Sequence, residues 1–202
     1  LETGTDLAVL KTGDESIYRY DQMGTHSYEN SSMQTGTNST SYYFSVASGD
    51  ITNFFNEVDL NTPWDYHYEN LDSRTILDRL AAVKYFVVKA GEEEYLPYGY
   101  DTLAAEAEKK DRLYRAYECK NALPIGYTYD SYIPEKKYAK MSTVEKQQAL
   151  LQGVILSNST VPETTSEFND REVSYKLVTG SGCKEKDGKL IITKENAQAK
   201  LV

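Results

Sequence analysis

Residues 73–88 read Ser-Arg-Thr-Ile-Leu-Asp-Arg-Leu-Ala-Ala-Val-Lys-Tyr-Phe-Val-Val, and they contain two periodicities in succession. In the first half, apolar residues recur at helical spacing, which predicts a helix over residues 73–81. In the second half, β-branched and aromatic residues predict a strand over residues 83–88. The apolar face of the helix consists of Ile76, Leu77, Leu80 and Ala81. Because so little chain separates the two elements, we expect the helix to pack directly on the strand.

Further patterns on both sides of this stretch complete the prediction. Ser-Thr-Val-Glu at 142–145 is a capping box, in which serine and glutamate satisfy each other's backbone amides, and it predicts a helix over 142–155. Shorter helices are expected at 51–58, after Asp50, and at 102–110. Strands are expected at 16–20, 113–117, 172–179 and 189–193. Together these elements predict an α+β fold with several helices packed on a mostly antiparallel sheet.

The domain organisation follows from a change in composition after residue 156. Residues 157–170 are rich in Ser, Thr, Asn and Glu, which is typical of a linker or a long loop. The dipeptide Asp-Gly at 187–188 favours a β-hairpin. We therefore expect an α+β domain over residues 1–156. Residues 157–202 should form a linker and a C-terminal β-hairpin that packs on the same domain.

Composition and charge restrict the class of protein. The chain has 202 residues, 40% of them hydrophobic and 26% charged, which is typical of a globular protein rather than a disordered one. The net charge of −9 argues against nucleic acid as a partner, because binding to phosphates needs a basic surface. The same charge disfavours a polyanionic ligand and favours a neutral sugar or glycolipid headgroup. No apolar run reaches the ~18 residues that a membrane-spanning helix needs.

The two cysteines, Cys119 and Cys183, are too few for a disulfide framework. A bridge between them would close a loop of about 64 residues, worth ~4 kcal/mol in the chain-entropy model. The simpler interpretation, which we favour, is two separate unpaired cysteines.

Motifs for catalysis or cofactor binding are weak. Nucleophilic catalysis needs a base, and the only histidines, His26 and His67, stand in polar loops, where surface positions are expected. No short-spaced pair of ligands indicates zinc, and there is no phosphate-binding glycine motif, so no metal and no cofactor is predicted. A glycosidase needs only two suitably placed carboxylates. The candidates are Asp65, Asp72, Asp101 and Asp130, but the sequence does not show that any two converge.

Aromatic and amide side chains share three loops, and this combination suits sugar binding because it offers stacking faces beside hydrogen-bonding groups. Tyrosine is also unusually common, with 18 residues against 5 phenylalanines. The alternative is that Trp64 and the tyrosines pin long loops onto the sheet. Lys84, in an otherwise apolar strand, is expected to have a structural partner. The candidate substrate-binding residues are Asn38, Tyr42, Tyr43, Trp64, Tyr66, Arg74, Tyr127 and Tyr129.

Several segments, taken in order, resemble a known family. They are Asn-Ser-Thr-Ser-Tyr-Tyr-Phe-Ser at 38–45, Leu-Ala-Ala-Val-Lys-Tyr-Phe-Val-Val at 80–88 and Asn-Ala-Leu-Pro-Ile-Gly-Tyr-Thr-Tyr-Asp-Ser-Tyr-Ile at 121–133, followed by the helix from Ser142. This series resembles the extracytoplasmic region of the YfhO family of bacterial membrane proteins. The resemblance extends from about Arg19 to Leu156, and no distinctive motif follows it.

The resemblance implies a piece of a larger membrane protein. The family is similar to lipid-linked-sugar glycosyltransferases that decorate cell-envelope polymers such as lipoteichoic acid. It implies a domain on the extracytoplasmic face of a bacterial membrane, with the transmembrane part of the same protein as its partner and the chemistry outside this chain, so no catalytic residue is expected here. The domain would then assist recognition of an acceptor glycan or glycolipid. A structural or interaction module without ligand, and an independent secreted glycan-active enzyme, are the alternatives.

Overall fold

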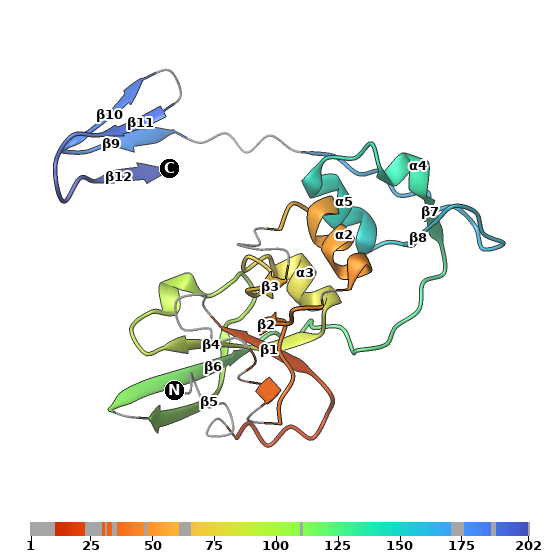
Figure 1. The fold of residues 1–202 in the computed structure, drawn as a ribbon, viewed down its shortest axis with the longest axis horizontal. Helices are drawn as coiled ribbons and strands as arrows, with labels where there is room; N and C mark the ends of the chain where they lie inside the picture. Colours follow the sequence, from red (N-terminus) through yellow and green to blue (C-terminus); the bar gives the residue numbers. More distant parts are fainter. Residues whose placement is uncertain are drawn as a thin grey trace. The chain divides into compact units, whose positions relative to one another are not determined.

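The structure is a computed structural model, and it describes residues 11–22, 30, 32–33, 36–46, 48–60, 66–109, 111–170, 176–186 and 189–201. Contacts divide the chain into two compact units, Leu1–Phe168 and Asn169–Val202, which are considered separately below. Figure 1 shows the elements of each unit. The change in composition predicts a boundary near residue 156, and the contacts divide the chain between residues 168 and 169.

The largest sheet belongs to the first unit and has four strands in the order β1-β4-β6-β5. These strands are β1 (Arg19–Gln22), β4 (Val83–Lys89), β5 (Thr102–Lys109) and β6 (Arg112–Glu118). The central strand β4 pairs with β6 in the antiparallel direction and with β1 in the parallel direction. β5 and β6 form an antiparallel hairpin at the other edge.

The predicted fold class, helices packed on a mostly antiparallel sheet, is wrong. Strands predominate over helices in the described residues, and they are distributed among one four-stranded mixed sheet and several two-stranded ones. The parallel pairing of β1 with β4 joins segments that are far apart in the sequence, and such a pairing leaves no local pattern in either strand. Local propensity therefore could not reveal it.

Strand β5 (Thr102–Lys109) replaces the short helix expected at 102–110. Its Ala- and Glu-rich sequence favours a helix by intrinsic propensity. Pairing with β6 along its length overrides that preference, and a bulge between Leu103 and Ala105 adjusts the register. The strand expected at 113–117 is confirmed as β6.

Strand β4 provides core residues on both faces of the sheet, because successive side chains in a strand point in opposite directions. Phe86 and Val88 belong to the larger core cluster, while Tyr85 and Val87 belong to a smaller one on the other face. Lys84 donates a 2.5 Å hydrogen bond to Asp14 Oδ2. This contact confirms the structural partner expected for that lysine.

Three helices complete the larger cluster. They are α2 (Gly49–Glu57), α3 (Thr75–Leu80) and α5 (Thr143–Leu150). Phe55 of α2 and Leu77 of α3 belong to the same buried cluster as Phe86, and Leu150 of α5 packs on that cluster. The three helices accordingly lie near one another in Figure 1. The predicted packing of the 73–81 helix against the following strand is confirmed, with the helix ending at Leu80.

The capping box at the start of α5 is confirmed. The Ser142 hydroxyl accepts a hydrogen bond from the Glu145 amide, and the Glu145 carboxylate accepts one from the Ser142 amide. Beside α5 lie β7 (Tyr132–Pro134), α4 (Glu135–Tyr138) and β8 (Val154–Leu156), and β7 pairs with β8 in the parallel direction. Phe168 packs on their small core, which explains why the first unit extends beyond residue 156.

The remaining helices and strands of the described chain are short. In the first unit, β2 (Tyr42–Tyr43) pairs with β3 (His67–Tyr68), and η3 (Glu93–Tyr95) is a single 3₁₀ turn. In the second unit, β9 (Leu177–Thr179) pairs with β12 (Ala199–Leu201). There, β10 (Cys183–Lys186) and β11 (Lys189–Ile192) form the expected hairpin. Cys119 and Cys183 are both free and buried, as the simpler interpretation expected.

Candidate functional site

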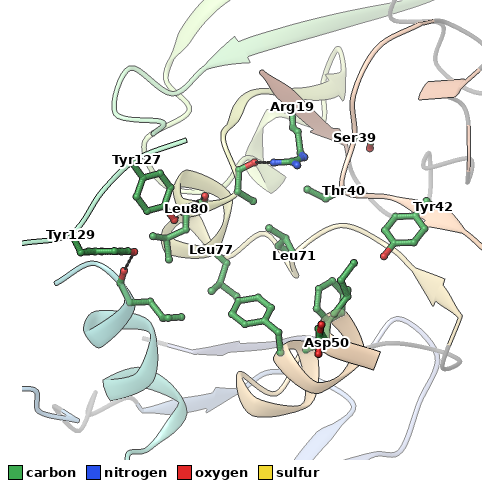
Figure 2. Close-up of a pocket in the computed structure, with 15 residues that line it drawn as sticks. Arg19, Ser39, Thr40, Tyr42, Asp50, Leu71, Leu77, Leu80, Tyr127 and Tyr129 are labelled. Carbon is green, nitrogen blue, oxygen red and sulfur yellow. Dashed lines mark hydrogen bonds between the residues drawn. The ribbon is translucent and has the colours of Figure 1, made fainter. Parts of the chain in front are cut away.

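An open pocket of about 570 Å³ lies in the first unit, among α2, α3 and the end of α5. Two extended segments, around residues 39–42 and 127–129, complete its wall. Figure 2 shows the residues that line it. Most of them are apolar, and the apolar wall consists of Ile51, Phe54, Phe55, Leu71, Leu77, Leu80, Ala81 and Leu150. Its volume and lining are typical of pockets that bind small molecules.

Tyr127 and Tyr129 stand together at one end of the pocket (Figure 2). Their rings meet edge to face, with centroids 5.5 Å apart. The Tyr127 hydroxyl donates to the Leu80 carbonyl at 3.3 Å, and the Tyr129 hydroxyl donates to the Leu150 carbonyl at 2.5 Å. Burial and then the hydrogen-bonding interaction with Tyr127 raise the pKa of Tyr129. Both hydroxyls therefore anchor the loop to helix ends, and the rings are left to form the wall.

Tyr42 lines the pocket from strand β2 (Figure 2). Its ring stacks on that of Tyr68, with centroids 4.6 Å apart and an angle of 28° between the planes. Burial and then the neighbouring Tyr68 raise the pKa of Tyr42. The Tyr68 hydroxyl in turn shares a 2.8 Å hydrogen bond with Thr52 of α2. Tyr42 is thus held in a fixed orientation by the core.

Arg19 gives the pocket a positive charge. One of its guanidinium nitrogens donates a 2.7 Å hydrogen bond to the Ala81 carbonyl. A guanidinium carries five N–H donors, so this bond leaves others for a ligand. Thr40, another residue of the lining, donates its hydroxyl to the buried carboxylate of Asp21. Asp50, at the start of α2, is an exposed acidic group of the lining.

The structure brings three of the eight predicted site residues, Tyr42, Tyr127 and Tyr129, to this pocket. Tyr43 and Tyr66 lie outside it as an exposed edge-to-face pair, with centroids 5.6 Å apart. The other three predicted residues also lie away from the lining or outside the described residues. Asn38 donates its side-chain amide to the Tyr18 carbonyl at 3.2 Å, and the Arg74 side chain binds a carbonyl at the end of α2. Trp64 lies outside the described residues.

Arg74 contacts the backbone at the C-terminal end of α2. Its guanidinium donates to the carbonyls of Val58 at 2.5 Å and Asp59 at 2.6 Å, and to the Asp72 carboxylate at 3.2 Å. The last carbonyls of a helix have no partner within the helix, so a cation there satisfies them and complements the helix dipole. Arg74 therefore joins the chain before α3 to the end of α2.

We expect Arg74→Met to lower the free energy of unfolding by about 1.5–3 kcal/mol, because two helix-end carbonyls lose a charged donor. Urea unfolding of both proteins would measure the difference. Arg112→Met, at an exposed position at the start of β6, serves as the matched control and should stay within about 0.5 kcal/mol of the parent. Equal midpoints for the Arg74 variant and the parent would contradict this role.

A buried pair of acids, Asp21 and Asp78, was not predicted. Both side chains are fully buried. The Ser41 hydroxyl and the Gln22 amide donate to Asp21, in addition to Thr40. Neither carboxyl oxygen of Asp78 has a hydrogen-bond partner in the described part of the chain. Burial raises the pKa of Asp21 to about 7, and burial together with the charge of Asp21 raises the pKa of Asp78 to about 9.

The other candidates for chemistry are dispersed. His67 was expected at the surface, but it lies in β3 with only 6% of its surface exposed, and the ring of Tyr43 on the paired strand β2 contacts it edge to face. Asp72 is paired with Arg74, and Asp101 accepts a bond from its neighbour Thr102. His26 and Asp65 lie outside the described residues. Within the described ranges, no group of three potential ligands could hold a metal ion.

Comparisons with known proteins complete the description. The family described as "Bacterial membrane protein YfhO" matches residues 4–201 of the chain. The chain is also 25% identical over 189 residues to the "Uncharacterized protein YfhO" of Bacillus subtilis (strain 168). That alignment covers 92% of this chain and 21% of the relative. No solved structure matches significantly.

These matches define a class, that of bacterial membrane proteins. The chain belongs to the YfhO family of that class. It spans about a fifth of the length of the curated relative that it matches. The family match also extends beyond residues 19–156, where the resemblance was evident in the sequence, and includes the second unit.

The described residues themselves contain no helix with the length and apolarity that a bilayer crossing requires.

Proposed function

We propose that this chain is an extracytoplasmic domain of a YfhO-family membrane protein with a glycosyltransferase role, and that it recognises an acceptor glycolipid. The observation that carries the proposal is the convergence of Tyr42, Tyr127 and Tyr129 on one open apolar pocket of about 570 Å³. Family membership supports the association with a membrane. The resemblance of the family to lipid-linked-sugar glycosyltransferases supports the sugar chemistry.

The pocket favours a glycolipid over a free glycan. A free sugar needs many hydrogen-bonding groups, but the hydroxyls of Tyr127 and Tyr129 already donate to backbone carbonyls. The wall formed by α2 and α3 instead offers apolar surface, and burying alkyl groups there gains about 0.8 kcal/mol per methylene. An alkyl chain therefore fits the wall, and the headgroup would lie at the open side.

A module that only holds other parts of the protein is the second candidate. The observation in its favour is that Arg74, Tyr127 and Tyr129 all bond to helix-end carbonyls and so fasten loops to helices. Under this alternative the pocket would bind no amphiphile, and the affinity test below separates the two.

We expect alkyl glucosides to bind the 202-residue chain with an affinity that rises about threefold to fourfold for each added methylene, while glucose does not enter the apolar pocket. Isothermal titration below the micelle concentration would measure this series. Ile51→Glu puts a charge on the pocket wall at a position that is 39% exposed, and it should weaken binding at least tenfold. The matched control is Val144→Glu, on α5 outside the lining and 45% exposed. No dependence on chain length, or equal losses in both variants, would refute the proposal.

The extracytoplasmic location has a separate test in the full-length protein in intact bacteria. Tyr98 is 88% exposed, whereas Cys119 and Cys183 are buried. The Tyr98→Cys variant should be labelled by a membrane-impermeant maleimide without lysis to a higher level than the parent protein. Labelling of Tyr98→Cys only after lysis would place the domain on the cytoplasmic side.

A further inference from the structure

The hairpin of the second unit, formed by β10 and β11, has one face on which the described charges are all positive. In an antiparallel pair, residues that stand directly opposite each other point to the same side of the sheet. Lys184 stands opposite Ile191, and Lys186 stands opposite Lys189. These four residues therefore share one side, which we call the basic face, and all four are exposed. Glu185 alternates with the lysines along β10 and so belongs to the other face.

The charges of the basic face are not neutralised within the described part of the chain. No described carboxylate lies within ion-pair distance of Lys184, Lys186 or Lys189. Like charges that stand directly opposite in a sheet are destabilising, so the pairing of Lys186 with Lys189 favours an anionic partner.

The second unit as a whole differs in charge from the rest of the protein. Residues 169–202 contain seven Lys and Arg against five Asp and Glu, whereas the full chain contains 22 against 31. A basic unit within an acidic protein is typical of a segment that meets an anionic surface.

Aliphatic side chains accompany the lysines and restrict that partner further. Ile191 on the basic face is 43% exposed, and Ile192 beside it is 69% exposed. A lysine opposite an aliphatic residue recurs between β12 and β9, where Lys200 stands opposite Val178, which is 46% exposed. A soluble polyanion has no apolar layer for such side chains. An anionic bilayer has both, phosphates at its surface and acyl chains just below them.

We propose that the basic face docks on the surface of an anionic lipid bilayer. The ammonium groups of Lys184, Lys186 and Lys189 lie at the level of the lipid phosphates. Ile191 enters the boundary between headgroups and acyl chains. Membership in a family of bacterial membrane proteins supports a bilayer close to the domain. The inference concerns the second unit alone, and it holds whether or not the apolar pocket of the first unit binds a glycolipid.

Co-sedimentation of the 202-residue chain with lipid vesicles tests the docking. Vesicles of phosphatidylcholine that contain about one third phosphatidylglycerol should bind the chain, and vesicles of phosphatidylcholine alone should not. The net charge of −9 opposes binding to an anionic surface, so binding requires a local basic surface. Raising the salt concentration about tenfold should weaken the binding, because salt screens charges at an exposed surface.

A triple variant identifies the surface that binds. Replacing Lys184, Lys186 and Lys189 together by Gln should weaken vesicle binding about a hundredfold, roughly fivefold for each lysine. Its melting temperature should be unchanged or higher, since like charges are removed, and this verifies folding. The control changes the net charge equally at three exposed lysines of the first unit and should bind as the parent does. It combines Lys120→Gln, Lys136→Gln and Lys140→Gln.

Two further measurements distinguish a lipid surface from an acidic polymer. Ile191→Thr keeps the β-branched shape and should weaken vesicle binding severalfold, since an aliphatic group no longer enters the acyl region. Poly-L-glutamate, at a carboxylate concentration equal to that of the anionic lipid, should not displace the chain from vesicles. The inference is overturned by sedimentation that does not depend on phosphatidylglycerol, by equal binding of the two triple variants, or by displacement with poly-L-glutamate.

Discussion

Raising the pH from 5 to 9 should lower the free energy of unfolding of this protein, and Asp78→Asn should remove much of that loss. Asp78 is fully buried, and its carboxyl oxygens have no hydrogen-bond partner in the described residues. Asp21, the acid whose charge affects it, is equally buried. Both carboxyls therefore hold their protons in the folded protein at a pH where the unfolded chain has released them.

The sign follows from the pKa shifts. The pKa of Asp78 rises from 3.8 to about 9 and that of Asp21 from 3.8 to about 7. Stabilisation by the bound protons is complete below pH 3.8 and is lost as the pH rises through the folded-state values. Each group contributes a slope of up to about 1.4 kcal/mol per pH unit. Both groups lower the free energy of unfolding as the pH rises from 4 to 7, and Asp78 alone lowers it further up to pH 9.

Urea unfolding at a series of pH values would measure this effect. Asp78→Asn should match the parent most closely at pH 4 and exceed its stability increasingly up to pH 9. Asp130→Asn, at an exposed position, controls for the change in net charge. Its free energy of unfolding should change with pH in the same way as that of the parent. If the two variants show the same slope, Asp78 is ionised in the folded protein and the assignment fails.

Phe86→Ala should lower the free energy of unfolding by about 3–5 kcal/mol. Phe86 lies on the central strand β4 with none of its surface exposed, and it belongs to the larger core cluster together with residues of α2 and α3. Tyr100 packs on its ring edge to face, with centroids 5.6 Å apart. Removing the ring leaves a cavity that surrounding helices and strands cannot fill without moving, so both the lost burial and the cavity contribute.

Phe44→Ala is the matched control, because the same substitution is made at a phenylalanine that is 56% exposed. It should change stability by less than about 0.5 kcal/mol. Chemical unfolding followed by far-ultraviolet circular dichroism would compare both variants with the parent. Similar losses at the two positions would mean that β4 is not the centre of the core.

The sequence predicts correctly those elements whose structure depends on residues close together in the chain. The capping box at Ser142 specifies the start of α5, because its two hydrogen bonds involve neighbouring residues only. The apolar stretch before Lys89 specifies β4, and the same stretch contributed to the family resemblance that the comparisons confirmed. These features depend on residues a few positions apart.

The features of the fold and of the pocket that the sequence did not reveal depend on contacts between distant segments. Residues 102–109 have helical propensity but form a strand because β6 supplies their hydrogen bonds. Tyr127 and Tyr129 could be selected as an aromatic loop, but the apolar wall they complete comes from α2 and α3, and its assembly is a matter of packing. Asp21 lies one residue beyond the strand predicted at 16–20, and only its pairing with β4 shows that it is buried.

The parallel pairing of β1 with β4 also sets an order of events during biosynthesis. Arg19 pairs with Val83, so β1 leaves the ribosome roughly 60 residues before its partner exists. Until then the nascent segment around Asp21 stays hydrated and ionised. Burial of Asp21 therefore has to follow the synthesis of β4, and because burial raises the pKa of Asp21 to about 7, it favours the uptake of a proton.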